Sequence, residues 1–298
     1  TSTGIDVLPG GLVRVSPTAE GVDHAHGAIQ LGQDCWVIAD EPVDASSTLL
    51  PSPDQALKLV RGGAELPSRV AENLFWLGRY SERAEAIARL LRTTMMRLSG
   101  EQSATSIPEM PGLISALAAI GQIEPDYAVE GFSGTLPGLD EALPKSLYTI
   151  DQQRGLSPSV TAMVDKATAV RDRISLDAYR IVRRVQDELV QSTEPGLRLD
   201  SRTAINRLSR LITELLAFAG LGQESITRTL GWRFLQLGRR IERAWQTAEL
   251  LRATLVSTRR GRKDAAAPAF DERPILEAVL EACDSVMTYR SRYLLRLE

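Results

Sequence analysis

The chain has 298 residues, 43% of them hydrophobic, which is enough to build one large core or two smaller ones. A net charge of −3 argues against a generic nucleic-acid binder, and no apolar run approaches the roughly 18–20 residues of a membrane span. The two cysteines, Cys35 and Cys283, lie far apart without metal-ligand spacing, so they predict no disulfide framework and fit a reducing cytoplasm.

Residues 1–45 differ in pattern from the rest of the chain. A Pro-Gly-Gly turn precedes alternating residues at 12–15, and 35–38 form a second short strand pattern. His24 and His26 lie between the two strands, but two histidines without a third ligand do not predict a metal site. Because two strands are only marginally stable alone, we expect this segment to complete a sheet that belongs elsewhere.

Residues 46–66 are rich in Ser, Pro and Gly, which is the composition of a linker. From residue 67 to 298, apolar residues recur at helical spacing, and prolines and glycines mark the breaks. This pattern predicts an all-α fold, a bundle of about six to seven helices preceded by a short strand-containing tail. The long helices are expected at about 69–98, 157–191, 200–219, 224–258 and from 272 onward, with short proline-bounded helices between 108 and 144.

One stretch occurs twice in the chain. Residues 77–94 and 237–254 are identical at 11 of 18 positions, at a single offset of 160 residues. Each copy holds a glycine in mid-helix, Gly78 and Gly238, where glycine costs about 1 kcal/mol relative to alanine. The repetition predicts an internal duplication in which two helices approach closely and pack across a pseudo-twofold axis.

Each copy also places Arg, Glu and Arg at i, i+3 and i+4, on one face of its helix. These six residues are Arg79, Glu82, Arg83, Arg239, Glu242 and Arg243. Three interpretations stay open. The residues form a buried, fully paired network that fixes the register of the helices, or they bind an anionic group, since four arginines against two glutamates leave a surplus of +2. In the third, Glu82 or Glu242 is a catalytic general base, although flanking arginines lower a carboxylate's pKa and weaken it as a base.

Further candidates surround the motif. Trp76 and Tyr80 lie beside its first copy and Trp232 precedes its second, where aromatic rings either pack in the core or stack on guanidinium groups in a cleft. Polar residues on later helices either reach the same place or face solvent. The complete set of additional substrate- or anion-binding candidates is Asn73, Trp76, Tyr80, Arg171, Arg173, Ser175, Trp232, Tyr289, Arg290 and Arg292. No phosphate-binding loop or metal cluster is present, so we expect neither a metal nor a cofactor in this chain.

Four separated stretches, occurring in order, resemble the Alpha-E domain, a family of helical domains named for a glutamate–arginine motif. They are residues 68–79 with Glu82-Arg83-Ala84, 170–175, 231–235 with 238–239 and 242–244, and 288–293. The resemblance covers residues 67–298. The family tends to have glutamate where this chain has Asp172, a shorter carboxylate that changes the reach of any pairing made there.

Residues 9–15 and 32–37 resemble the C-terminal end of a circularly permuted ATP-grasp protein. Fusion of such a unit to an Alpha-E domain is a known arrangement. The resemblance implies that the residues that bind ATP and Mg lie upstream, outside these 298 residues. We therefore expect that residues 1–45 do not bind nucleotide and that the chain alone does not hydrolyse ATP.

Together the two resemblances imply ATP-dependent amide or peptide bond formation, often beside transglutaminase-like proteins. The leading hypothesis is a helical substrate- or acceptor-binding domain that serves an upstream ATP-grasp ligase, fused or associated. Its Arg/Glu centre would hold the anionic end of a peptide or amino-acid substrate. The alternative is a non-catalytic structural module that scaffolds the ligase and its partners. Neither nucleic acid nor a membrane is expected as a partner.

Overall fold

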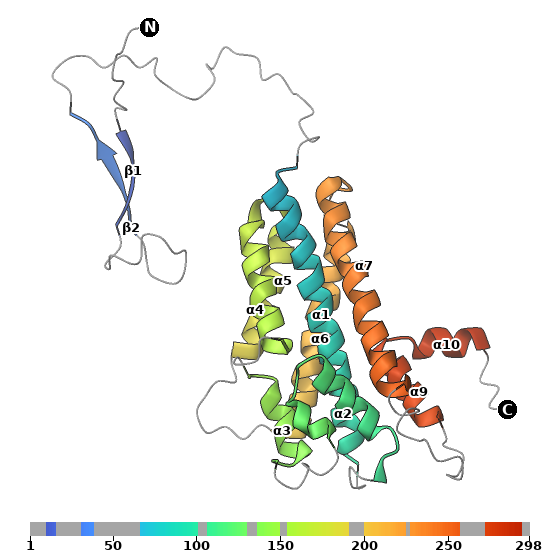
Figure 1. Cartoon of the computed structure of the whole chain (residues 1–298). Coiled ribbons are helices and arrows are strands. Elements are labelled where there is room, and N and C mark those ends of the chain that lie inside the picture. Colours follow the sequence, from blue (N-terminus) through green and yellow to red (C-terminus); the bar gives the residue numbers. More distant parts are fainter. Residues whose placement is uncertain are drawn as a thin grey trace. The chain divides into compact units, whose positions relative to one another are not determined.

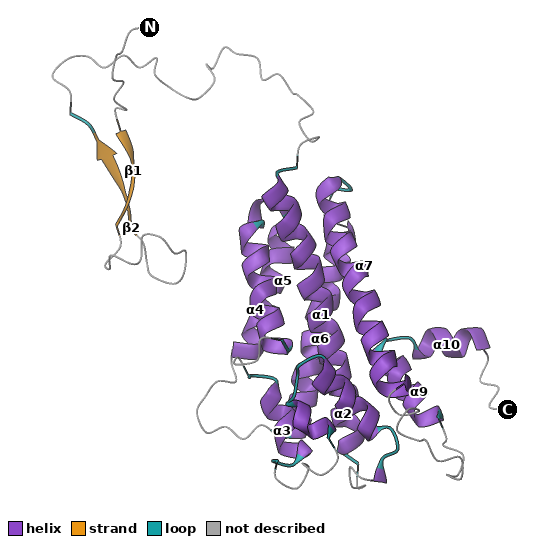
Figure 2. Ribbon diagram, viewed as in Figure 1, coloured by secondary structure: helices purple, strands orange, loops and turns teal. Residues whose placement is uncertain are grey.

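The computed structural model describes residues 10–15, 31–38, 66–100, 106–129, 136–149, 154–190, 200–224, 227–256 and 272–293. The chain divides into two compact units, residues 1–61 and 62–298. The described part of the larger unit consists of helices and their connecting loops (Figure 2), so the all-α prediction is confirmed.

The smaller unit holds one antiparallel pair of strands, β1 (Gly10–Val15) and β2 (Leu31–Trp36). Both strands lie where the sequence predicts them, although β2 begins four residues earlier and ends two residues earlier than expected. Trp36 and Ile38 are exposed within this unit, which agrees with a hairpin that lacks a packed sheet face of its own. His24, His26 and the predicted linker up to residue 65 lie outside the described residues.

Nine α-helices lie in the described part of the larger unit. They are α1 (Ser68–Leu98), α2 (Met110–Ala119), α3 (Leu139–Ser146), α4 (Leu156–Ala169), α5 (Leu176–Val190), α6 (Ser201–Glu224), α7 (Leu230–Leu251), α9 (Arg273–Ala282) and α10 (Val286–Tyr293). The helix α1 occupies the centre and packs extensively on α4, α6 and α7 (Figure 1), so its apolar residues form the middle of the core.

The two repeat helices, α1 and α7, lie side by side along most of their length (Figure 1), as the duplication predicts. Their glycines explain how close they come. A Cβ atom on Gly78 would overlap the carbonyl oxygen of Leu235, and a Cβ atom on Gly238 would overlap the carbonyl oxygen of Phe75. The reciprocal contact means that each glycine admits the backbone of the other helix.

The long helix predicted at 157–191 is two helices, which corrects one expectation. The chain leaves α4 after Ala169, passes through a 3₁₀ turn, η4 (Arg171–Arg173), and is extended at Ile174. The hydroxyl of Ser175 then accepts a hydrogen bond from the backbone N–H of Ala178, 3.1 Å away. Ser175 therefore caps the start of α5, and a new helix begins there instead of a continuation of the old one.

Three other predicted boundaries also differ. The helix α6 continues through the glycines at 220–222 to Glu224 instead of ending at 219, and α7 begins only at Leu230, after the extended residue Thr229. At its other end α7 passes into a π-helical segment, η5 (Arg252–Val256). The first two shifts have local causes. Glycines inside a helix weaken it without ending it, and a new helix begins after an extended residue.

The final predicted helix is divided too, and the division reveals a second repeat. Both α2 and α9 follow a glutamate and have proline in the first turn. Both end at a left-handed residue, Gly121 with φ of 75° and Asp284 with φ of 54°. In each case the next backbone N–H returns to a carbonyl five residues earlier, over 2.9 Å in α2 and 2.8 Å in α9. The duplication thus includes the second helix of each half, at an offset of 163 residues instead of 160.

Candidate functional site

The two Arg-x-x-Glu-Arg motifs meet across the α1–α7 contact. The carboxylate of Glu242, which is fully buried, accepts hydrogen bonds from Arg79 Nε at 2.6 Å and from Arg83 Nε at 2.6 Å. Arg83 Nη2 donates a further bond at 3.1 Å, and Gln246 on α7 donates one at 3.0 Å. Each carboxylate oxygen of Glu242 thereby accepts two bonds, most of them charge-assisted.

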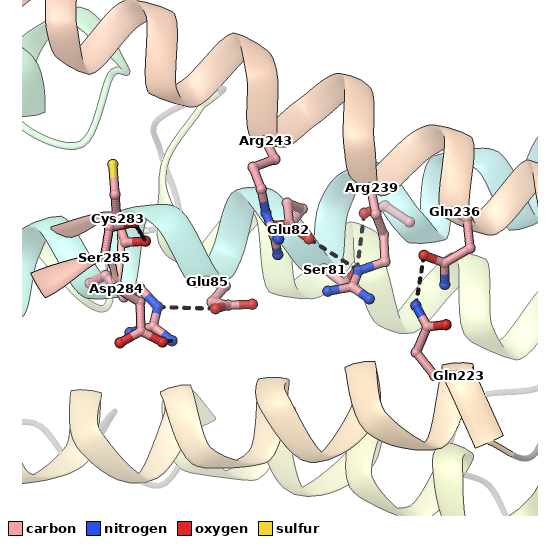
Figure 3. Close-up of polar contacts among 12 residues, drawn as sticks. Ser81, Glu82, Glu85, Gln223, Gln236, Arg239, Arg243, Cys283, Asp284 and Ser285 are labelled. Carbon is pink, nitrogen blue, oxygen red and sulfur yellow. Dashed lines mark hydrogen bonds and ion pairs between the residues drawn. The ribbon is translucent and has the colours of Figure 1, made fainter. Parts of the chain in front are cut away.

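The second carboxylate is bound in the same way from the opposite helix. Glu82 accepts a hydrogen bond from Arg239 Nε at 3.0 Å and another from Arg243 Nε, as Figure 3 shows. Each glutamate therefore binds both arginines of the other repeat and neither of its own. The arrangement agrees with the network interpretation, because it fixes the register of the two helices.

The pKa of Glu242 follows from these contacts. Burial by itself would raise the pKa, but the hydrogen bond and charge of Arg83, with the bonds from Gln246 and Arg79, outweigh it and leave the pKa below its ordinary value. A carboxylate that is ionised and fully hydrogen-bonded is a poor proton acceptor. The geometry therefore gives the catalytic role predicted for Glu82 and Glu242 no support, and that role stays a prediction.

Aromatic rings support the first pair of arginines. The guanidinium carbon of Arg79 lies 5.4 Å from the Trp76 ring centroid, and that of Arg83 lies 5.4 Å from the Tyr80 centroid. Trp76 and Tyr80 stack on each other with centroids 5.6 Å apart. These distances are typical of cation–π contacts, so the rings help to hold the guanidinium groups that bind Glu242.

A cavity of about 500 Å³ lies beside the paired centre. It is bounded by α1, α2, α6 and α7 and by the turn between α9 and α10. The lining residues are Glu82, Glu85, Ala86, Arg89, Leu90, Ala116, Ile120, Leu216, Arg243, Gln246, Thr247, Leu250, Ala282, Cys283, Asp284 and Ser285. Of the residues predicted for a site, Glu82 and Arg243 line this cavity.

The cavity also holds a second ion-paired group, which the sequence analysis did not single out. The buried Arg89 donates from Nε to Glu85 at 3.0 Å and from Nη2 to Asp284 at 3.1 Å. Glu85 and Arg89 stand at i and i+4 on α1, a signal that the sequence does contain. Asp284 could not be connected to them from sequence, since it lies almost 200 positions later and is brought there by the end of α9.

Figure 3 shows the order of these groups along α1, with Glu82, Arg239 and Arg243 to one side of Glu85 and the turn at 283–285 to the other.

At the turn at 283–285, burial raises the pKa of the Cys283 thiol, and a hydrogen bond with Thr247 opposes the rise only in part. The thiol is therefore mostly protonated near neutral pH, which does not favour a nucleophilic cysteine.

The remaining candidate residues are not among those that line the cavity. Arg171 stacks on Tyr179, Arg173 pairs with its neighbour Asp172 at 2.9 Å, and Ser175 caps α5. Three others are exposed on α10, one lies beside Arg228, and one is buried on α1. None of these five lines the cavity. They are Tyr289, Arg290 and Arg292 on α10, Trp232 beside Arg228, and Asn73 on α1. Their predicted binding roles stay predictions.

Metal binding and membrane insertion are two other possibilities for the described residues. No group of three or more His, Cys, Asp or Glu side chains there could hold a metal ion. Among the same residues, no helix is both long and apolar enough to cross a membrane.

Comparisons with known proteins identify the fold family. Residues 66–298 match the Alpha-E family model, described as a predicted alpha-helical domain with a conserved ER motif. Uncharacterized proteins of Mycobacterium bovis and Mycobacterium tuberculosis are 32% identical over 270 residues. The match covers 87% of this chain, more than the family model spans, so it includes residues before 66, yet it covers only 30% of the relatives' length. No solved structure matches. Within the matched residues, Glu-Arg occurs at 82–83 and at 242–243 in the repeat helices, and the chain belongs to the Alpha-E family.

Proposed function

We propose that this domain binds the substrate or acceptor of an ATP-grasp-type amide or peptide ligase, in the cavity beside the cross-paired Arg/Glu centre. The class of molecule that suits the cavity is an amino acid or a short peptide with both termini charged. In this proposal the paired centre holds α1 and α7 in register, and Arg243 extends from it into the binding site.

The observation that supports this proposal most is that exposed side chains of both charge signs line the cavity. Arg243 has an exposed guanidinium, and its described hydrogen bond uses only Nε. The remaining guanidinium N–H groups can donate to a ligand carboxylate. Asp284 is also exposed, and its described bond uses one carboxylate oxygen. The other oxygen can accept a hydrogen bond from an ammonium group.

The ligase setting rests on two further observations. Residues 9–15 and 32–37 resemble the end of a permuted ATP-grasp unit, and the similarity to the curated relatives includes residues before 66. This chain spans 30% of those relatives' length, which leaves room in them for a catalytic unit. In such a protein the ATP-grasp part would activate a carboxylate with ATP and Mg, and the helical domain would present the acceptor amine.

Calorimetric titration with matched peptides tests the binding site. The probes are Ala-Ala, its N-acetyl form and its C-terminal amide, which remove one terminal charge at a time. We expect Ala-Ala to bind most tightly, and each capped form to lose about 1.4 kcal/mol or more, which is tenfold in Kd. Arg243→Gln should remove the preference for a free carboxylate, and Asp284→Asn the preference for a free amine.

The matched control is Arg180→Gln, which breaks an exposed ion pair with Asp177 on α5 and should leave binding unchanged. Equal heats for all three probes, or none for any of them, would refute the proposed site.

The structural alternative has its own support, because every motif arginine already binds a carboxylate. In that case the domain is a scaffold, and the motif stabilises it without contacting a ligand. Thermal melts beside the titrations separate the two functions. A scaffold predicts that Arg243→Gln changes stability alone, whereas a binding domain predicts a loss of peptide affinity that exceeds any change in stability.

A further inference from the structure

One face of α7 is apolar and exposed. Its residues are spaced alternately by four and three positions, which is the seam of a helix that packs against another helix. We call this face the α7 seam, and it consists of Leu230, Phe234, Leu237, Ile241, Ala244, Ala248 and Leu251. Trp245, also exposed, borders the same face between Ile241 and Ala248. Seven aligned positions over the full helix exceed the scattered apolar residues that are normal on a protein surface.

The duplication shows how such a seam is covered in the other half. The positions 160 residues earlier are Val70, Leu74, Leu77, Ser81, Ala84, Ala88 and Leu91. All of them are buried except the partly buried Val70, and α1 packs against α4 and α6 in addition to α7. The sharpest contrast is between Leu77, with no exposed surface, and Leu237, which is 48% exposed.

The covering helices have no counterpart around α7 in the part of the chain that the structure describes. Beyond its long contact with α1, α7 makes small contacts with α2 and with η5, the segment that follows it. It also meets the end of α6, where Gln236 accepts a hydrogen bond from Gln223 at 3.0 Å. The two halves correspond in their first helices, α1 and α7, and in their second, α2 and α9, including the left-handed residues that end the latter pair. Because the two halves correspond so closely, the helices that cover this face of α1 indicate that a helix also covers the α7 seam.

We propose that the α7 seam is the docking surface for an amphipathic helix that packs on α7 as α4 packs on α1. Its apolar face should resemble that of α4, where Leu156, Val160, Met163, Val164 and Ala167 are buried. The source is a further segment of the longer polypeptides in which this domain occurs, since the curated relatives extend well beyond the matched part. This inference is independent of the cavity and its ligand.

A second copy of the chain fits the seam less well. Arg240 is exposed beside the middle of the seam, and Arg233 is exposed two turns earlier on the same side. An antiparallel pair of α7 helices would bring two Arg240 side chains together near the twofold axis, and like charges across an interface oppose association.

The test adds the α4 segment in trans, as a synthetic peptide of residues 154–170, and follows tryptophan emission of the 298-residue chain. Burial of Trp245 should shift its emission to shorter wavelength, with saturation at a Kd of about 100 µM or tighter. Leu237→Asp and Ile241→Asp should each weaken binding at least tenfold. Both positions are exposed, so these variants should fold, which far-UV circular dichroism checks.

Two controls identify the signal. Trp245→Phe should bind the peptide without the emission shift, and a peptide with Val160→Asp and Met163→Asp should not bind. The proposal is overturned if no shift occurs up to about 1 mM peptide, a Kd too weak for a specific helix contact. It is also overturned if Leu237→Asp leaves binding intact. A wild-type dimer that Leu237→Asp makes monomeric would assign the seam to a second copy, and vesicle binding lost in the same variant would assign it to a membrane.

Discussion

The helices α1 and α7 have the same motif, the same mid-helix glycine and the same contact with each other, yet their surroundings differ. The α1 helix is enclosed by α4, α6 and α7, whereas α7 has a packed face toward α1 and an exposed apolar face beside it. The shared motif and glycine hold the two helices together. Glu85 and Arg89 on α1 correspond to Trp245 and Glu249 on α7, and these residues contact different surroundings.

The same comparison explains why the motif repeats so closely. An ion pair that crosses from one helix to the other needs the correct register in both, and each glutamate here binds the arginines of the opposite copy. A shift of either helix by one residue would separate all four pairs. Substitutions at equivalent positions of α1 and α7 can therefore distinguish the stability that comes from their mutual contact from the stability that comes from their different surroundings.

The largest effect is expected from alanine at the two glycines. Gly78→Ala and Gly238→Ala each place a methyl group onto a carbonyl oxygen of the other helix, and a backbone atom cannot move aside as a side chain can. The cost should exceed the 1–3 kcal/mol of ordinary overpacking, at about 3 kcal/mol or more. Urea denaturation of each variant measures it. Gly220 lies in α6, and nothing lies within 4 Å of a Cβ atom added there, so Gly220→Ala should instead stabilise the protein by up to about 1 kcal/mol.

The next largest loss of stability is expected from neutralising the buried carboxylates. Glu242→Gln leaves Arg79 and Arg83 without a charged partner, and breaking a buried pair costs about 3–5 kcal/mol. Glu82→Gln should cost less, because one of its partners, Arg243, is largely exposed and can turn to water. Chemical denaturation of both variants compares them. A cost below about 1 kcal/mol for Glu242→Gln would mean that the pair behaves as an exposed one.

Truncation of the equivalent leucines tests the unequal surroundings. Leu77→Ala should cost about 2–5 kcal/mol, as for a fully buried leucine, whereas Leu237→Ala should cost under about 1 kcal/mol while the α7 seam is uncovered. Thermal melts of the two variants give the difference. In the presence of a bound helix the cost of Leu237→Ala should rise toward that of Leu77→Ala, and equal costs in its absence would contradict the exposed seam.

The smallest effect concerns pH. Because the folded-state pKa of Glu242 is lowered, its contribution to stability is full above the unfolded pKa, about 4.3. That contribution is lost as the pH falls through the folded value. Wild-type unfolding free energy should therefore decline below about pH 4.3, and Glu242→Gln should lack that part of the decline. Denaturation curves between neutral pH and pH 3 measure both, and parallel curves would exclude Glu242 as the titrating group.

The sequence alone was sufficient for the helical class and for the pairing of the repeat helices. The repeated Gly-Arg and Glu-Arg positions predict a close contact, because a mid-helix glycine with charged neighbours at i+1, i+4 and i+5 is costly unless another helix meets it. Helix boundaries were less predictable at Ser175, Thr229 and Asp284. At these positions a single cap, extended residue or left-handed residue decides between a break and a continuation.

Only the tertiary structure decided which charges meet and where a cavity forms. Sequence spacing restricts neighbours within one helix, so it placed Arg79, Glu82 and Arg83 on one face but could not tell own-helix from cross-helix pairing. It could not bring Asp284 to Arg89, since that contact depends on how α9 ends and packs against α1. Equally, the apolar spacing of α7 resembles that of the buried α1, and exposure of the seam follows only from which helices lie around it.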